Sequence, residues 1–471
     1  MYRLVRISIQ NWGLIGAVDI DVRGSTALIG TTAVGKSSVQ DAVQTVITGA
    51  KRSSLRFSSS VGGLSTRTIL GYCLGVTRQQ DKGDVRLRDE CETILALVFE
   101  DTEVGDHLTI GVAISASCGA TEEVILSRFI TPGYAFSMHD AQRHVGIEAT
   151  LPWSNVKELI KAKSPEFIEY KSAEKYTDEF LRRMHHAGQA PSSKWFLAAF
   201  GHAVAFSPIC DPARFVREYI LEQDDLDIEG VKASIAAWRE IEIVINPTAD
   251  GKHRERAGAA ILKFFSGLGE RLTGAQHKLA QINERLAKWP INGRVYALVS
   301  RDTDQFQRIN DLAREVSSLS GGLATKLDDG GVDDAVAQLE SPAANKFVDY
   351  REYLDFDIVM TDETGKRTAL SERAVKGSAG EAVEPFYVAM AAALSSAYFP
   401  EEAPTGMGLV MFDEAFAKLD ASSARKLLKL YGDMNLQPII TAPEGRQATF
   451  AELVDTVVVV NKMPNGQAAF I

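Results

Sequence analysis

The fold of this chain is decided by the stretch Ala27-Leu28-Ile29-Gly30-Thr31-Thr32-Ala33-Val34-Gly35-Lys36-Ser37-Ser38. It begins as a short apolar strand, passes through the pattern G-x-x-x-x-G-K-S and ends at the start of a helix. The glycines of this pattern let the backbone turn so tightly that successive N–H groups point into one concavity, where phosphate oxygens bind. The stretch therefore predicts a nucleotide-binding loop.

Different parts of this loop have different expected tasks. Lys36 brings a mobile positive charge to the β- and γ-phosphates, and the Ser37 hydroxyl is placed to ligate Mg²⁺. The helix from Ser38 to Ile47 adds the positive end of its dipole. The alternative is an ordinary glycine-rich turn that binds nothing, and the strand and helix on either side of the loop favour nucleotide binding. The residues expected to contact ATP are Gly30, Thr31, Thr32, Ala33, Val34, Gly35, Lys36, Ser37 and Ser38.

Composition narrows the class of protein. The 471 residues allow two or three domains, and the net charge of −11 argues against a generally basic nucleic-acid coat, so a DNA contact must come from a local patch. The four cysteines form no C-x-x-C pair, which suits a reducing compartment. The N-terminus alternates like a strand, and no later run reaches membrane-spanning length. We expect a soluble, cytoplasmic protein with no membrane partner.

The first half of the chain reads as an antiparallel lobe followed by a helical lobe. Leu4–Ile9 and Ala17–Val22 alternate like the strands of a hairpin around the turn at Asn11–Gly13. Three further strand-like runs cover 92–99, 108–116 and 123–130. Residues 150–225 then turn helical, and the aromatic residues of 193–200 and 215–221 are expected to pack in the core.

A basic segment follows the helix of the nucleotide-binding loop. Lys51, Arg52 and Arg56 lie close together in an otherwise acidic chain, and they are candidates for contact with the phosphate backbone of DNA. A solvated loop face is the alternative, and the sequence leaves both open. Arg67, in Ser65-Thr66-Arg67-Thr68, is instead a candidate for contact with the nucleotide.

The middle of the chain carries two segments with seven-residue periodicity. The first runs from Ile228 to Ile241, and the second places Leu272, Ala275, Leu279, Ile282, Leu286 and Trp289 on one stripe. A turn at 246–252, a helix over 254–265 and a glycine-containing bend separate them. We expect an antiparallel helical pair at 226–290, with ordinary surface helices as the alternative. Residues 316–346 read as loop or loosely packed helix, and 356–360 with the turn at Gly365 as a hairpin.

The C-terminal region supplies a second chemical motif. Leu409-Val410-Met411-Phe412 is a buried strand that runs into Asp413 and Glu414. Asp413 is expected to hold Mg²⁺, and Glu414 to orient and deprotonate the attacking water, because phosphoryl transfer depends on positioning and charge stabilisation. Glu414 and Lys36 are thus the predicted catalytic residues.

A third motif precedes this strand. Ser378 and Glu381 have the S-x-x-E spacing of a capping box in front of the apolar helix 386–394, so they mark a helix N-terminus that can bind an anion. A cap without any ligand is the alternative. The position of Ser378 and Glu381 shortly before the Asp-Glu strand favours a functional role for this helix N-terminus. The similar Ser320-Gly321-Gly322 is set aside, because no Glu or Gln follows it.

Together these motifs resemble the ABC-type head of SMC-like ATPases. The resemblance is greatest to the MukB-like branch, and within that branch to the JetC motor subunits of Wadjet anti-plasmid systems. It is carried by the segments 66–72, 203–221, 380–389 and 413–420. The resemblance implies an α/β ATPase head with an antiparallel lobe, a helical lobe and a short coiled-coil stub. Its N-terminal half would cover 1–225, the stub 226–290 and the C-terminal half 291–471.

The same resemblance implies a mechanism and partners. Two heads would form a homodimer around two ATP molecules, each bound by one P-loop and by Ser378, Gly380 and Glu381 of the other copy, with Asp420 at the interface. Kleisin and accessory subunits, double-stranded DNA and a partner nuclease in a separate chain are the implied partners. Chromosome-organising condensins and Rad50- or RecF-like repair ATPases are alternatives, as is a nucleotide-binding docking module that is not a motor.

Some positions depart from the pattern of such heads. Ala379 stands where the first glycine of the signature is usual, and the strand 438–441 ends in Thr441 without the usual switch histidine. Gln142 and Gln223 are candidates for the Q-loop glutamine. The helical segments are stubs compared with the long arms of these proteins, as expected for a head without its arms or for an armless relative.

Overall fold

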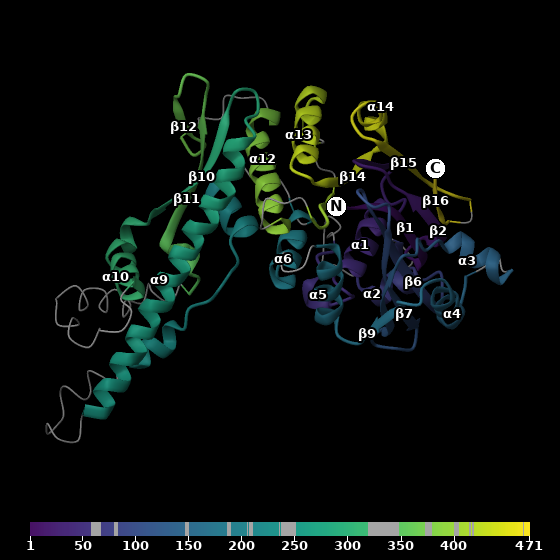
Figure 1. Ribbon diagram of the computed structural model, residues 1–471, viewed down its shortest axis with the longest axis horizontal. Helices are drawn as coiled ribbons and strands as arrows, with labels where there is room; N and C mark the ends of the chain where they lie inside the picture. Colours follow the sequence, from purple (N-terminus) through teal and green to yellow (C-terminus); the bar gives the residue numbers. More distant parts are fainter. Residues whose placement is uncertain are drawn as a thin grey trace. The chain divides into compact units, whose positions relative to one another are not determined.

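The computed structural model describes residues 1–57, 67–79, 83–146, 150–185, 190–204, 206, 211–234, 236, 251–318, 348–372, 379–399, 405–413, 416, 419–464 and 466–471, apart from the side chains of 251–258, 260–261, 379–382 and 447. The chain divides into two compact units. The first combines Met1–Pro208 with Gly377–Ile471, and the second is Ile209–Lys376. Each unit is described by itself (Figure 1).

The first unit contains an antiparallel sheet of six strands. The predicted N-terminal hairpin forms its edge, because Asn11 and Gly13 adopt the positive φ angles of 57° and 56° that the turn requires. The three strands predicted between 92 and 130 form its centre, so the antiparallel lobe is confirmed. In spatial order the strands are β2 (Ile15–Asp21), β1 (Tyr2–Trp12), β6 (Glu90–Asp101), β7 (His107–Ser117), β8 (Val124–Pro132) and β9 (Ile168–Tyr170).

The second sheet of this unit joins the two ends of the chain. Its strand β3 (Thr26–Gly30) comes from the N-terminal half and pairs in parallel with β14 on one side and β15 on the other. The parallel strands are mainly apolar, as expected where both faces of a sheet are covered, although β14 also carries Gln437 and Thr441. In spatial order the strands are β13 (Leu409–Phe412), β14 (Gln437–Pro443), β3, β15 (Thr456–Lys462) and the antiparallel β16 (Ala468–Phe470).

Side-chain hydrogen bonds also connect the two sheets. The amide of Gln437, at the start of β14, accepts from the Leu4 N–H at 2.8 Å and donates to the Leu4 carbonyl at 2.8 Å. The backbone of Tyr2 also forms an isolated parallel β-bridge with Met407, just before β13. Since Gln437 is buried, both bonds are shielded from water, and the N-terminal strand cannot separate from the C-terminal sheet without leaving polar groups unpaired.

Helices cover both sheets of the first unit. Helix α1 (Lys36–Ile47) is buried along nearly its whole length, because it contacts β3 of one sheet and β1, β6 and β7 of the other. The apolar helix α12 (Ala379–Tyr398) packs on α6 and α13. The remaining helices and the small hairpin are η1 (Arg52–Ser54), α2 (Ile69–Leu74), β4 (Thr77–Gln79), β5 (Gly83–Val85), α3 (Met138–Val145), α4 (Trp153–Lys163), α5 (Ala173–Met184), α6 (Ser193–Val204), α13 (Ala421–Asp433), η7 (Glu444–Arg446) and α14 (Gln447–Ala451).

The second unit is built around one long helix. Helix α9 (Gly251–Lys288) packs along α10 (Gln307–Ser318) and against β10, as Figure 1 shows. The predicted hairpin around Gly365 is present and extends a three-stranded sheet in the order β10–β11–β12. The other elements of the unit are α7 (Pro212–Phe215), η2 (Val216–Ile220), β10 (Val295–Asp302), η3 (Asp304–Phe306), η6 (Tyr350–Tyr353), β11 (Leu354–Thr361) and β12 (Arg367–Ala369).

Several expectations for the middle of the chain need correction. The predicted glycine-containing bend after 254–265 is wrong, because α9 continues through it. The apolar stripe from Leu272 to Leu286 is buried as predicted, although it belongs to a helix that packs on α10 and β10. Contacts group the described residues of 291–372 with α9 in one unit, and the three parts predicted at 1–225, 226–290 and 291–471 stay a prediction. Residues 237–250 and 319–347 lie outside the described residues.

The glycines of α9 have a packing role in place of the predicted bend. A Cβ added at Gly269 would lie 2.1 Å from the Ala313 carbonyl oxygen of α10, whereas one added at Gly274 meets nothing within 4 Å. Gly269 therefore lets the two helices approach closely. Among the described residues, no helix combines the length and apolarity that a membrane crossing requires.

Two alanine substitutions test this account of α9. Gly269→Ala should lower the free energy of unfolding by about 1–3 kcal/mol, because the new methyl group collides with backbone. Gly274→Ala is the matched control and should raise it by up to about 1 kcal/mol through helix propensity alone. Urea denaturation followed by circular dichroism measures both. Equal effects at the two positions would contradict the close approach of α9 and α10.

Candidate functional site

The loop between β3 and α1 has the backbone of a phosphate cradle. Ala33 and Gly35 adopt positive φ angles of 63° and 115°, which fold the loop back on itself. Gly30 has no room for a side chain, because a Cβ there would lie 2.3 Å from the Val460 carbonyl oxygen of β15. The sequence pattern is thus explained by conformation at Gly35 and by close packing at Gly30.

The N-terminus of α1 is open to an anion. Gly35 is its N-cap residue, no side chain of the described residues caps it, and its first turn carries no acidic residue. The first backbone N–H groups of a helix lack partners within the helix and bind phosphate readily. The Lys36 ammonium donates to the carbonyl oxygens of Gly30 at 2.5 Å and Thr31 at 2.8 Å, which keeps this charge beside the cradle.

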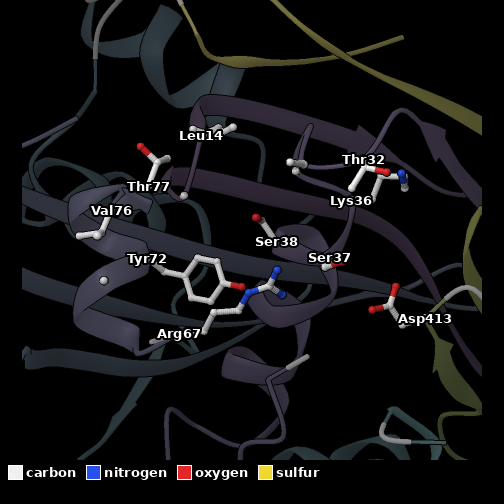
Figure 2. Close-up of a pocket in the computed structure, with 14 residues that line it drawn as sticks. Leu14, Thr32, Lys36, Ser37, Ser38, Arg67, Tyr72, Val76, Thr77 and Asp413 are labelled. Carbon is white, nitrogen blue, oxygen red and sulfur yellow. The ribbon is translucent and has the colours of Figure 1, made fainter. Parts of the chain in front are cut away.

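One cavity of about 450 Å³ gathers these groups with residues from the far end of the chain. In Figure 2, Lys36 and Asp413 lie toward one end of the cavity, Leu14, Val76 and Thr77 toward the other, and Arg67 and Tyr72 between them. The cavity is thus lined by charged groups at one end and by apolar groups at the other. Its lining residues are Gly13, Leu14, Thr32, Ala33, Gly35, Lys36, Ser37, Ser38, Arg67, Gly71, Tyr72, Val76, Thr77 and Asp413.

Asp413 is placed by a hydrogen bond to its carboxylate and by another to the residue before it. It directly follows β13, and the Thr441 hydroxyl of the neighbouring β14 donates to its carboxylate at 2.6 Å. The side-chain amide of Gln40 on α1 donates to the carbonyl of Phe412, the preceding residue, at 2.7 Å. Because β14 lies between β13 and β3, Thr441 sits between the two motif-bearing strands. The prediction that this strand ends at Thr441 is wrong, since β14 continues to Pro443.

The sequence did not single out the apolar end of the cavity. Leu14 lies in the turn after Trp12, and Val76 and Thr77 begin the small β4–β5 hairpin. Tyr72 is recognisable in the sequence only as part of the segment that resembles other ATPase heads. The glycines at 13 and 75 are the only local signal, because a positive φ angle at both positions lets these two segments meet: the Gly13 N–H donates to the Tyr72 carbonyl at 2.7 Å.

Some predicted site residues are placed outside the cavity or are not described. Glu414, Ser378 and the Glu381 side chain lie outside the described residues, whereas Gly380 lies in the first turn of α12. Gln142 lies on α3 and Gln223 in the second unit, and neither lines the cavity as described.

Asp420 has a structural task in the described part of the chain. It is the N-cap of α13 and accepts from the backbone N–H groups of Ser422 and Ser423 at 2.9 and 3.0 Å. The bonds from Ser423 and Ser422 hold its pKa below the usual range of an aspartate. A cap of this kind fixes the start of the helix, so Asp420 stays ionised and rigid on an exposed surface.

The three residues predicted to contact DNA lie around η1 and already have partners. Lys51 pairs with Glu174 at 3.1 Å, and Arg52 pairs with Glu122 and, at 2.9 Å, with Glu123. The Arg56 guanidinium donates to the carbonyl oxygens of Ser53 and Leu55 at 3.3 and 3.2 Å. The Lys51–Glu174 pair is exposed and contributes little free energy, so a phosphate backbone can compete for Lys51, whereas Arg52 is also paired with the buried side chain of Glu123. DNA contact at this loop stays a prediction.

Comparison with known proteins identifies the two motif regions. Residues 345–433 match a family model described as SbcC/RAD50-like, Walker B motif, and residues 4–61 match the P-loop containing region of AAA domain. A search of curated protein sequences finds no match. Both models describe P-loop ATPases, and their matches indicate that the chain hydrolyses ATP.

Solved structures similar to the chain are distant in sequence. An SmcHead bound to the C-winged helix domain of ScpA is 11% identical over 99% of this chain and 96% of that one, with a TM-score of 0.43. RecF–ATPrS, a recombination mediator protein in the RecFOR pathway, is 11% identical over 100% and 98%, with a TM-score of 0.44. An Smc head with an extended coiled coil from Pyrococcus furiosus, bound to the C-terminal domain of ScpA, is 12% identical over 100% and 96%, with a TM-score of 0.37.

The fold is that of an ABC-type P-loop ATPase head, as predicted. Its P-loop strand β3 is separated from the Walker B strand β13 by β14, and an antiparallel sheet packs against the P-loop helix. The two matched regions are the two motifs that the cavity brings together.

A substitution at Thr441 tests the placement of Asp413. Thr441→Val keeps the shape of the side chain but removes the hydroxyl that donates to Asp413, so ATP turnover should fall about 10- to 100-fold, as when a hydrogen-bond partner of a metal-binding carboxylate is removed. Thr441→Ser retains the hydroxyl and should stay near the wild-type rate. Steady-state ATPase assays measure both, and a valine variant as active as the serine variant would contradict this role.

Proposed function

We propose that this chain is the ATP-hydrolysing head of an SMC-like DNA motor, in which two copies close around two ATP molecules. The observation that carries the proposal is that Lys36 and Ser37, from the start of the chain, and Asp413, from its end, line one cavity. A triphosphate needs these groups together: backbone N–H groups and a lysine for its oxygens, and a hydroxyl and a carboxylate for its metal ion.

The donor set fits Mg²⁺. Ser37 and Asp413 offer a hydroxyl and a carboxylate oxygen, the hard ligands that Mg²⁺ takes in combination with substrate phosphates and water. Bound there, Mg²⁺ neutralises charge on the phosphates. Thr441 donates to one carboxylate oxygen of Asp413 at 2.6 Å, and the other oxygen would take the metal ion.

The chain's own residues divide the remaining work. The N–H groups of the first turn of α1 and the Lys36 ammonium would bind the β- and γ-phosphates, and Arg67, which lines the same cavity, is a further cation for them. Glu414 directly follows Asp413 in sequence, so it is the residue that would orient the attacking water and accept its proton. Dimerisation would complete the site with Ser378, Gly380 and Glu381 of a second copy, and with Asp420 at the interface.

The finer proposal concerns what ATP hydrolysis drives. The sequence resemblance supports a JetC-like motor that extrudes DNA loops in plasmid defence, with kleisin and accessory subunits, double-stranded DNA and a nuclease in a separate chain as partners. A condensin that organises chromosomes and a Rad50- or RecF-like repair ATPase remain the alternatives. A nucleotide-binding docking module without motor activity is the alternative from a different class.

A substitution of the proposed catalytic base separates a motor head from a docking module. Glu414→Gln should bind ATP, reduce turnover by about 10²-fold or more and elute as a dimer when ATP is present, because the closed state is no longer released by hydrolysis. Lys36→Ala is the control that should neither bind ATP nor dimerise. ATPase assays and size-exclusion chromatography measure these outcomes, and a Glu414→Gln variant that stays monomeric with ATP would point to a docking module.

Charge reversal tests the predicted DNA-binding loop. Lys51→Glu, Arg52→Glu and Arg56→Glu together should weaken DNA binding and reduce the slope of log K against log salt by about 0.9 for each DNA phosphate that the protein no longer neutralises. The control reverses Lys163, Arg425 and Lys429, three exposed cations elsewhere in the same unit, with the same change in net charge. An equal decrease in affinity in both triple variants would contradict DNA contact at the η1 loop and would indicate that the loop is a solvated surface.

A further inference from the structure

A carboxylate is buried behind the phosphate cradle. Asp41 lies in the second turn of α1 and is 0% exposed. It accepts a hydrogen bond from the Tyr72 hydroxyl and another from the Gln44 side-chain amide at 3.1 Å. Taking a carboxylate out of water costs several kcal/mol unless hydrogen bonds and a positive charge compensate. No step of the proposed hydrolysis uses Asp41, so its burial needs another explanation.

The positive charge near Asp41 comes from the wall of the nucleotide cavity. One terminal nitrogen of the Arg67 guanidinium lies 3.8 Å from the Asp41 carboxylate. That nitrogen is buried and has no hydrogen-bond partner among the described residues, while the Arg67 side chain as a whole is 32% exposed. Asp41 thus attracts Arg67 by charge at a distance too long for a hydrogen bond, and the exposed part of the Arg67 side chain lines the nucleotide cavity.

Tyr72 connects these two groups and is itself held rigidly. Its ring stacks on Trp12 with 4.6 Å between ring centroids, and Phe57 meets it edge-on at 5.3 Å. The indole N–H of Trp12 donates to the Ser38 carbonyl of α1 at 2.8 Å, so the aromatic cluster is fixed to the phosphate-binding helix. Burial, followed by the nearby Asp41 carboxylate, raises the pKa of the Tyr72 hydroxyl far above its ordinary value, so the hydroxyl remains protonated and donates to Asp41.

The direction of the Arg67 side chain follows from this arrangement. Figure 2 shows the guanidinium beside the Tyr72 hydroxyl and facing the side of the cavity that holds Ser37 and Ser38. Residues 58–66, which precede Arg67, lie outside the described residues. Within the described part of the chain, Asp41 and Tyr72 are the residues that orient the Arg67 side chain. A long, flexible arginine bound in one orientation loses less entropy when it meets an anion.

We propose that Asp41 and Tyr72 are positioning residues that hold Arg67 in the orientation in which it binds the phosphates of ATP. This inference rests on the proposed function, because it takes ATP as the ligand of the cavity. Asp41 does not line the cavity and acts only through Arg67, and the Tyr72 hydroxyl acts through its bond to Asp41 while the Tyr72 ring forms part of the cavity wall. The rival explanation is that the buried pair only stabilises the packing of α2 on α1.

A double-mutant cycle distinguishes the two explanations. Asp41→Asn and Tyr72→Phe should each weaken MgATP binding by about tenfold in the presence of Arg67, and by less than about twofold in an Arg67→Ala background, since residues that act through one another are not additive. Isothermal titration calorimetry with a non-hydrolysable ATP analogue and Mg²⁺ measures the affinities. Tyr72→Phe keeps the aromatic packing and so serves if Asp41→Asn does not fold.

The matched control is Tyr176→Phe, in the same unit. Tyr176 is fully buried, its hydroxyl has no hydrogen-bond partner among the described residues, and it does not line the cavity. This variant should bind the analogue like the wild type. Decreases in affinity that are equal with and without Arg67 would overturn the positioning role while leaving the ATPase proposal intact. A wild-type protein that does not bind the analogue would overturn the proposed function and this inference with it.

Discussion

The structure depends on the pairing of β3, the strand that carries the phosphate-binding loop. Its hydrogen-bonded neighbours are β14 and β15, which lie more than 400 residues further along the chain. The N-terminal part therefore cannot form the nucleotide cradle alone, because β3 would expose unpaired backbone groups on both edges. The same pairing places β13 and its Asp413 one strand beyond β14 and brings the two motifs into one cavity.

Helix α1 connects several segments around the nucleotide cavity through buried polar side chains. Three of its buried polar side chains, Gln40, Asp41 and Gln44, are each bonded to a different segment: the end of β13, Tyr72 of α2, and the backbone of Arg56. Burying such groups stabilises the fold only if their partners are in place, and removing one partner costs the full desolvation penalty. The helix thus connects the cradle, Asp413 and the loop around η1.

Sequence reasoning predicted what is encoded locally. The loop 30–38, the N-terminal hairpin, and the strand before Asp413 follow from short patterns whose physical requirements are local, and they hold in the structure. The predicted bend after 265 was wrong, because a glycine inside a helix can serve close packing as well as a break in the helix. At Gly269 the missing side chain is required by the approach of α10. The roles of Asp41 and Tyr72, and the bond from Thr441 to Asp413, were not predicted because the partners lie 28 or more residues apart and no spacing rule connects them.

The central claim is that both ends of the chain bind one triphosphate. Crystals grown with a non-hydrolysable ATP analogue and Mn²⁺ in place of Mg²⁺ test it directly, because anomalous diffraction locates the metal ion independently of the phosphates. We expect a single peak between Ser37 and Asp413, with the triphosphate over the first turn of α1 and against Lys36. A nucleotide bound in a cavity that Asp413 does not line, or a metal peak remote from both residues, would contradict the account.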